Sequence, residues 1–248
     1  MDPIKINAGR AHLNGVSIYS NKGFAQVLLD KKNHQYKIRS GGFKKSENNI
    51  SKVLNIISKI PFLRSFILIY NVLRRNRKKL LKALVLYIVA IVLLIVIDTP
   101  LTDQVNSALN NEKVLYLGII LGVGLIIRIT RLSNFHGAEH MVINYYTQYK
   151  DLEFNDLKNI SRVSTHCGSL LVIETFIIFY FMSFFSPFTD SNFLIAYMVA
   201  YEVFKGQYKI FKPIMLMSYW VQEYILTAKP TDEELNVAKL ALKKAIQI

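Results

Sequence analysis

The sequence predicts a mainly α-helical protein that crosses a membrane several times and carries a small β-containing extension at its N-terminus. Two observations predict this fold class. Of the 248 residues, 52% are hydrophobic and gather in long uncharged runs, while 31 Lys and Arg against 17 Asp and Glu give a net charge of +14. A disordered basic tail would be poor in apolar residues, and a soluble nucleic-acid binder would not hold such runs. A polytopic membrane protein with basic cytoplasmic flanks accounts for both observations.

Residues 1–50 form the predicted extension, which is basic and placed in the cytoplasm. Alternating polar and apolar residues at 24–30 and 34–40, with Gly and Asn nearby, are typical of a small β-hairpin unit. The N-terminus shows no short apolar stretch followed by a cleavage site, so no signal peptide is expected.

Residues 51–226 form the predicted membrane region. The run 83–97 carries no charge, and with its apolar flanks it approaches the length of about 20 residues that spans a bilayer. Residues 53–73 are apolar but interrupted by charges and a proline, which favours an interfacial or re-entrant helix. Spans are expected near 80–98, 114–131, 168–188 and 193–209, with 211–226 as a candidate fifth.

Charged residues set the expected orientation. Six Lys and Arg lie in 74–82, and acidic residues outnumber basic ones in 98–113, so the first of these segments is cytoplasmic and the second lies outside. Both termini are then cytoplasmic, and 227–248 forms a cytoplasmic helix that opens with a capping box at Thr231 and Glu234. The expected partners are the bilayer, with anionic lipids at the basic face, and a protein partner or second copy; nucleic acid is much less favoured.

Three of the five histidines fall where the second predicted span ends and the third begins. His136 and His140 are four residues apart, so on a helix they share one face, and Glu139 lies beside them. The string fits the H-x-x-E-H pattern, in which two histidines bind zinc and the glutamate takes a proton from water. Glu139 is therefore the candidate catalytic base.

His166 and Cys167 are the other candidate ligands. The third span begins at the membrane depth where the second ends, so these two residues are expected to approach the histidine pair. Four nitrogen and sulfur ligands suit zinc. The chain has a single cysteine, which excludes an internal disulfide. The simpler alternatives are that the paired histidines form a polar helix face and that Cys167 is a small buried residue.

Three functions follow from this pattern. The first is a metal-dependent hydrolase. The second is a non-enzymatic membrane factor, for example in protein insertion or envelope maintenance, in which a closed four-ligand metal site is structural. The third is a solute or ion transporter that uses Glu174 and Glu202 within the membrane.

Four stretches resemble the YqhQ-like family of bacterial multi-pass membrane proteins and occur in the same order along the chain. This family is defined by a domain of unknown function, and its members are predicted to be metal-dependent enzymes. The stretches are 8-AGRAHLNGVSIYS-20, 136-HGAEHMVINYY-146, 162-RVSTHCGS-169 and 213–246. The second is the most specific, because it matches the family's H-G-A-E-H-K block. The resemblance implies a location in the bacterial inner membrane and a metal site, but no substrate.

Five positions match the family's motifs residue by residue, namely His136, Glu139, His140, Cys167 and Gly168. Other positions depart from them. Aligned on Cys167, the family's histidine falls on Ser164 and its arginine on His166, while the glutamate and arginine of the opening motif fall on Asn14 and Tyr19. The resemblance therefore implies a divergent member, in which His166 replaces the lost histidine if local geometry allows.

Overall fold

The computed structural model describes residues 4–30, 35–43, 54, 56–71, 73–74, 112–187 and 189–248. The chain divides into two compact units. Unit 1 comprises Met1–Ser46, Ile120–Glu174 and Gln207–Ile248, and unit 2 comprises Glu47–Ile119 and Thr175–Gly206. Unit 1 holds the predicted metal ligands, so its architecture is the one that positions the candidate site.

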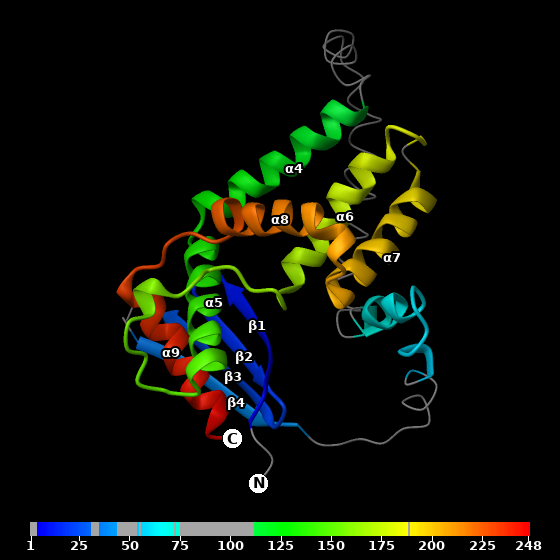
Figure 1. Ribbon diagram of the computed structural model, residues 1–248. Helices are drawn as coiled ribbons and strands as arrows, with labels where there is room; N and C mark the ends of the chain where they lie inside the picture. Colours follow the sequence, from blue (N-terminus) through cyan, green and yellow to red (C-terminus); the bar gives the residue numbers. More distant parts are fainter. Residues whose placement is uncertain are drawn as a thin grey trace, which may run out of the picture. The chain divides into compact units, whose positions relative to one another are not determined.

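A four-stranded antiparallel sheet is the centre of unit 1 (Figure 1). The strands follow one another in chain order as β1 (Ile6–His12), β2 (Gly15–Ser20), β3 (Gly23–Asp30) and β4 (Gln35–Gly42). Two-residue turns join the first three strands, and β3 alternates buried and half-buried residues as a strand with one covered face must. Strands β3 and β4 overlap the alternating stretches at 24–30 and 34–40.

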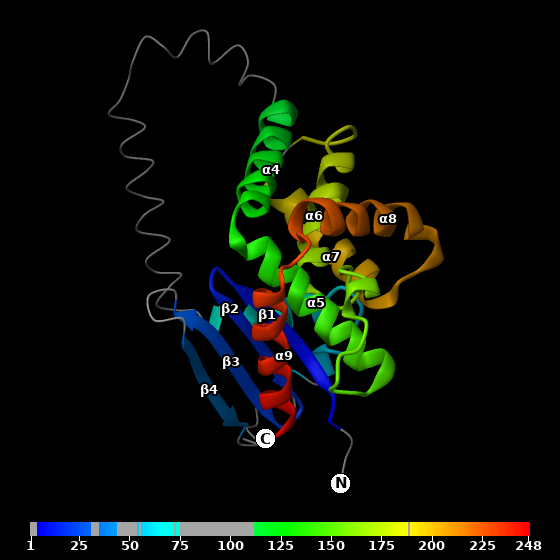
Figure 2. The same ribbon diagram turned by 90° about the vertical axis from the view of Figure 1, so that its left-hand side faces the viewer.

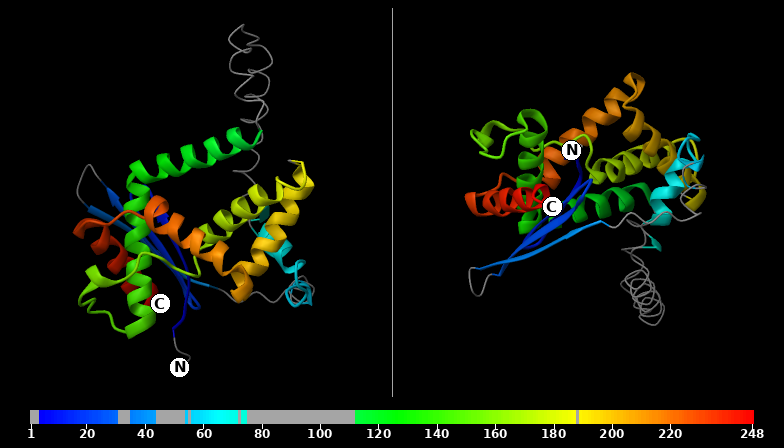
Figure 3. Two further views of the ribbon diagram at one scale, coloured as in Figure 1. Left: turned by 45° about the horizontal axis from the view of Figure 1, so that its top comes forward. Right: turned by 90° about the horizontal axis from the view of Figure 1, so that it is seen from below.

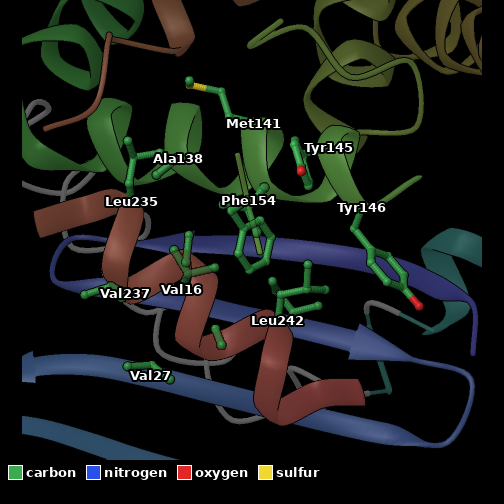
Figure 4. Packing of buried hydrophobic residues seen from close by; sticks show 14 of the residues in the cluster. Val16, Val27, Ala138, Met141, Tyr145, Tyr146, Phe154, Leu235, Val237 and Leu242 are labelled. Atoms are coloured by element: carbon green, nitrogen blue, oxygen red, sulfur yellow. The ribbon is translucent and has the colours of Figure 1, made fainter. Parts of the chain in front are cut away.

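Two helices cover one face of this sheet, α5 (Arg131–Tyr149) and α9 (Asp232–Ile246) (Figures 2 and 3). They are far apart in the sequence, since α5 ends at Tyr149 and α9 begins at Asp232, but they lie side by side. Apolar side chains of β2, β3, α5 and α9 interlock with Phe154 in one core (Figure 4). Val16 and Val27 face each other across β2 and β3 in this core, and both are fully buried. The basic N-terminal segment therefore supplies the sheet on which the histidine-bearing helix α5 packs.

Helix α9 begins at the predicted capping box, which is confirmed. The backbone N–H of Thr231 donates to Glu234 Oε2 at 2.9 Å, and Glu234 is the third residue of the helix. Glu234 also accepts hydrogen bonds from Arg131, the first residue of α5. One carboxylate thus stabilises the start of α9 and ties it to the start of α5.

Unit 1 also contains helix α8 (Lys212–Val221), which continues directly into a π-helical turn, η3 (Gln222–Leu226). Short 3-10 turns, η1 (Leu157–Asn159) and η2 (Lys209–Phe211), complete it. Helices α4 (Glu112–Ile129) and α6 (Gly168–Met182) contribute residues to both units.

Unit 2 also holds helix α7 (Asp190–Gly206). Its Glu202 carboxylate accepts hydrogen bonds from the Arg64 guanidinium and, at 2.8 Å, from the Phe62 backbone N–H. Tyr116 and Phe193 both pack edge-on against the Phe179 ring.

The predicted fold class, a mainly α polytopic membrane protein, is wrong. Across the described ranges the structure combines helices with an antiparallel sheet, and no single helix there is long and apolar enough to cross a bilayer. Within the described residues, the one pair that meets the requirement by length and composition is Tyr116–Ile129 of α4 with α5, and these two helices are bent by 77° at their junction. The physical reason is helix length: the 15 residues of α6 rise by about 22 Å, short of a hydrocarbon core of about 30 Å. The predicted span at 80–98 lies outside the described residues.

Candidate metal centre

Helix α5 places His136 and His140 on one face, as their spacing of four residues predicts. Their imidazole rings lie 4.4 Å apart between centroids, at an interplanar angle of 64°. His140 is almost completely buried, and His136 is half-buried. The two rings therefore open toward the same small region of the interior rather than toward solvent.

Each ring is held through its Nδ1 atom by a backbone carbonyl. The His136 Nδ1 atom lies 3.2 Å from the carbonyl oxygen of Leu226, and the His140 Nδ1 atom lies 2.5 Å from that of Arg162. Because a carbonyl oxygen can only accept, the proton of each neutral ring must sit on Nδ1. Both Nε2 atoms then carry a lone pair. Metal-binding histidines in proteins are commonly oriented in this way.

Cys167 completes a group of three ligand atoms. Its Sγ atom lies 3.3 Å from His136 Nε2, and one ligand atom from each of His136, His140 and Cys167 lies within 4.8 Å of the others. Two ligands of a tetrahedral zinc ion, at about 2.1 and 2.3 Å from it, are themselves about 3.6 Å apart. The group is thus close to the size that a small cation requires.

The His140 Nε2 atom is the most informative atom of this group. It is buried and has no hydrogen-bond partner among the described residues. Nearly all buried polar atoms in proteins are paired, so an orphaned one needs a reason. A cation held by His140 Nε2 and the Cys167 sulfur would satisfy it, so the residues present fit a bound metal.

Burial favours the uncharged form of the three grouped side chains and of Glu139 beside them. It lowers the pKa of His136, and burial with the neighbouring His136 lowers the pKa of His140 to about 3. Burial raises the pKa of Glu139 to about 8, and burial followed by the nearby Glu139 carboxylate raises the pKa of the Cys167 thiol. Neutral imidazoles are ready to bind a cation, whereas the thiol must lose its proton to do so.

Glu139 lies next to the cluster and against the sheet. Its side chain is 4% exposed and rests on Gly9 of β1, where a Cβ atom would come 1.9 Å from Glu139 Oε1. Glu139 is not one of the three grouped ligands. It is a buried carboxyl group one helical turn from His136, in the position of a neighbouring acid or base.

The structure does not bring His166 into the group. Its side chain is exposed, and its Nδ1 atom lies 2.8 Å from the hydroxyl of Thr165. His166 and Cys167 are adjacent just before α6, and of the two only Cys167 is grouped with the histidines of α5.

The two carboxylates of the transporter hypothesis lie elsewhere. Glu174 is buried and accepts a hydrogen bond from Ser218 at 3.4 Å, while its Oε2 has no partner among the described residues. Burial raises the pKa of Glu174 to about 7. Glu202 forms an ion pair with Arg64, so its charge is compensated within unit 2.

The polar residues that support Cys167 were not predicted from the sequence. The amide of Gln222 accepts from the Ser164 backbone N–H at 2.9 Å and donates to the Ser169 hydroxyl at 3.0 Å. That hydroxyl lies 3.2 Å from Cys167 Sγ. Gln222 is fully buried, and the signal available in the sequence was a lone amide within the apolar stretch 211–226.

The backbone partners of the histidines have no signal in the sequence at all. Leu226 is the last residue of the π-helical turn η3, where a carbonyl has no partner within the helix, and its carbonyl oxygen faces His136. The chain then passes close to α5, where a Cβ atom at Gly137 would meet the Ala228 carbonyl oxygen at 2.2 Å. Gly137 permits this approach.

Comparison with known proteins bears on the same residues. Residues 74–248 match the family model described as "Protein of unknown function (DUF1385)". The "Uncharacterized protein YqhQ" of Bacillus subtilis (strain 168) is 30% identical over 142 residues, which cover 51% of this chain and 44% of that relative. The alignment thus spans less than half of the relative's length. No solved structure matches the chain. The family match includes α5 and Cys167 but not β1.

Proposed function

This chain belongs to the DUF1385 family, and we propose that it is a metal-dependent hydrolase. The membership confirms the resemblance to YqhQ-like proteins that the sequence motifs indicated. In this proposal a divalent cation is held by His136 Nε2, His140 Nε2 and Cys167 Sγ. Imidazole and thiolate ligands together favour zinc over magnesium or calcium.

The orphaned Nε2 atom of His140 carries the proposal. Burying a hydrogen-bonding atom without a partner costs about 1–3 kcal/mol, and this protein bears that cost on a ring that two further contacts hold in place. A bound cation removes the cost. The carbonyl of Arg162 fixes the tautomer that leaves this nitrogen available.

The number of ligands favours a catalytic site over a structural one. Structural zinc sites have four protein ligands, whereas catalytic sites have three and keep one position open. Three ligands are grouped among the described residues, and His166, the predicted fourth, faces Thr165 instead. A cation in such a site supplies Lewis acidity to a substrate carbonyl, a phosphoryl group or a water molecule.

Glu139 is the residue that would move the proton. Hydrolysis adds water across a bond, so one proton leaves the attacking water and one reaches the leaving group. A cation beside Glu139 would favour the ionised form of its carboxyl group, and that carboxylate could then accept the first proton on one oxygen and return it to the leaving group. The sheet below holds this carboxylate in place through Gly9, which leaves no room for it to swing toward β1.

The proposal is tested by comparing the hydrolysis rates of the Glu139→Gln variant and the wild-type protein. We expect a panel of aryl esters and aryl phosphates to include at least one that zinc-loaded wild-type protein hydrolyses. Glu139→Gln should bind the same amount of zinc but lose at least about 100-fold in kcat. His166→Ala is the matched control and should retain both. If the zinc-loaded wild-type protein hydrolyses none of the substrates faster than the variant does, the hydrolase proposal fails. The metal would then only join α5 to the segment that carries Cys167.

A further inference from the structure

Two arginines donate to one backbone oxygen beside the metal ligands. Arg128 Nη1 lies 3.0 Å and Arg162 Nη1 lies 3.1 Å from the carbonyl oxygen of Thr227. Since both nitrogens bind the same atom, they are within about 6 Å of each other. Both guanidinium groups belong to unit 1, as do the metal ligands.

The same backbone segments hold these arginines and orient the histidines. Arg162 binds His140 Nδ1 through its own carbonyl. Thr227 directly follows Leu226, whose carbonyl holds His136 Nδ1. The two guanidinium groups are therefore held by the same backbone segments that orient the histidine pair.

The positive charge of this pair is poorly compensated. Among the described residues, the one carboxylate that forms an ion pair with either arginine is that of Glu223, 3.8 Å from Arg162 Nη2 and 39% exposed. Arg131, three residues along the chain from Arg128, is different: it pairs with both Glu233 and Glu234. One arginine is enough to satisfy the carbonyl oxygen at the end of a helix, because that carbonyl carries no net charge. Two full charges on one carbonyl need another explanation.

We propose that Arg128 and Arg162 bind a phosphate group of the substrate. The proposal rests on the hydrolase function and specifies its substrate class as a phosphate ester. Each guanidinium carries five N–H donors, of which the described residues engage only a part, and its planar fork matches phosphate oxygens. A phosphate monoester carries close to two negative charges at pH 7, which two guanidinium ions neutralise, whereas a carboxylate matches one.

The proposal can be tested by direct binding of inorganic phosphate, measured by calorimetry on the full chain. We expect saturable binding to wild-type protein, weakened at least ten-fold in both Arg128→Gln and Arg162→Gln. Arg131→Gln is the matched control and should bind phosphate as the wild type does. Zinc content should be equal in all four proteins, so a failure of the metal proposal would be seen separately.

Three outcomes would overturn the proposal. The first is an equal loss of phosphate binding in Arg131→Gln, which would mean that net charge alone attracts the anion. The second is phosphate binding that survives both arginine substitutions but disappears in His136→Ala, which would place phosphate on the metal. The third is acetate binding as tight as phosphate binding. If Arg162→Gln does not fold, Arg128→Gln decides alone, since Arg128 is exposed and its loss leaves the His140 contact intact.

A vesicle arm identifies the source of the phosphate group. Glycerol 3-phosphate and vesicles containing phosphatidic acid carry the same monoester, one in solution and one at a lipid surface. Competition of each with inorganic phosphate in wild-type protein, lost in Arg128→Gln, supports the site and shows which source it accepts. Failure of both to compete would contradict the assignment of the site to a phosphate ester.

Discussion

Gly9 of β1 lies directly beneath Glu139 of α5, so close that a Cβ atom at position 9 would come 1.9 Å from Glu139 Oε1. The N-terminal sheet, which was predicted from the sequence to be a separate extension, therefore forms one wall of the candidate site. This contact gives the first prediction.

Gly9→Ala should displace the Glu139 carboxylate. The atom it would meet is at the end of a flexible side chain, so the chain should still fold, with a loss of about 1–3 kcal/mol in the free energy of unfolding from overpacking. Hydrolysis should fall by a larger factor than zinc affinity, since the ligands are untouched. Urea unfolding measures the loss in the free energy of unfolding. Gly42→Ala, where the nearest atom is 3.7 Å from the new Cβ, is the control and should change stability little.

Gly137→Ala should destabilise the protein although it lies inside a helix. Alanine normally stabilises a helix interior by about 1 kcal/mol relative to glycine. At position 137, however, the new Cβ would meet the Ala228 carbonyl oxygen at 2.2 Å, and backbone cannot yield as a side chain can. The loop after Leu226 must then move away from His136. Gly122→Ala on α4, where nothing lies within 4 Å, should be neutral or stabilising. Equal effects of the two substitutions on the melting temperature would contradict the predicted close approach.

Glu234→Ala should cost more stability than Glu233→Ala. Glu234 is buried, caps α9 through Thr231 and accepts from Arg131, whereas the Glu233 side chain is 42% exposed. We expect a loss of about 1–3 kcal/mol for Glu234→Ala and less than about 0.5 kcal/mol for Glu233→Ala. Thermal unfolding measures the stability of both variants, and each variant removes one carboxylate partner of Arg131. A larger loss for Glu233→Ala would show that Arg131 depends mainly on the exposed partner.

The Arg64–Glu202 pair should make stability depend on pH in the acid range. The Arg64 guanidinium, by its hydrogen bonds, holds the pKa of Glu202 below its usual value. A depressed pKa in the folded state means that the pair stabilises fully above the unfolded pKa of about 4.3, and that this contribution is lost as the pH falls through the lower folded value. Glu202→Gln should therefore lower the melting temperature at pH 7 but change it little near pH 3. A difference that stays constant between these pH values would contradict the ion pair.

Part of the site could be predicted from the sequence because helix periodicity fixes which residues share a face. His136, Glu139 and His140 are related by that periodicity alone, so their proximity followed directly. Cys167 and His166 are adjacent, and no periodic rule decides which of them turns toward α5. The carbonyls of Leu226 and Arg162 could not be found, since any residue type supplies a carbonyl.

The fold class was wrong for a different reason. Apolar runs predict burial but not the length of the helix that forms within them. The run at 168–188 contains a helix that ends at Met182, and 211–226 turns from α-helix to π-helix at Gln222. The change at Gln222 coincides with tertiary contacts, namely the hydrogen bonds of its side chain to Ser164 and Ser169. Residue-by-residue hydrophobicity does not contain that information.

The metal centre itself is the central claim, and cobalt substitution tests it most directly. Co²⁺ takes the place of zinc and reports its ligands through its absorption spectrum. We predict one cobalt ion per chain, with a thiolate-to-cobalt charge-transfer band that disappears in Cys167→Ser and with binding lost in His136→Ala and His140→Ala. His166→Ala should keep both the stoichiometry and the band. Wild-type protein that binds no cobalt, or a band that survives in Cys167→Ser, would contradict the proposed ligand set.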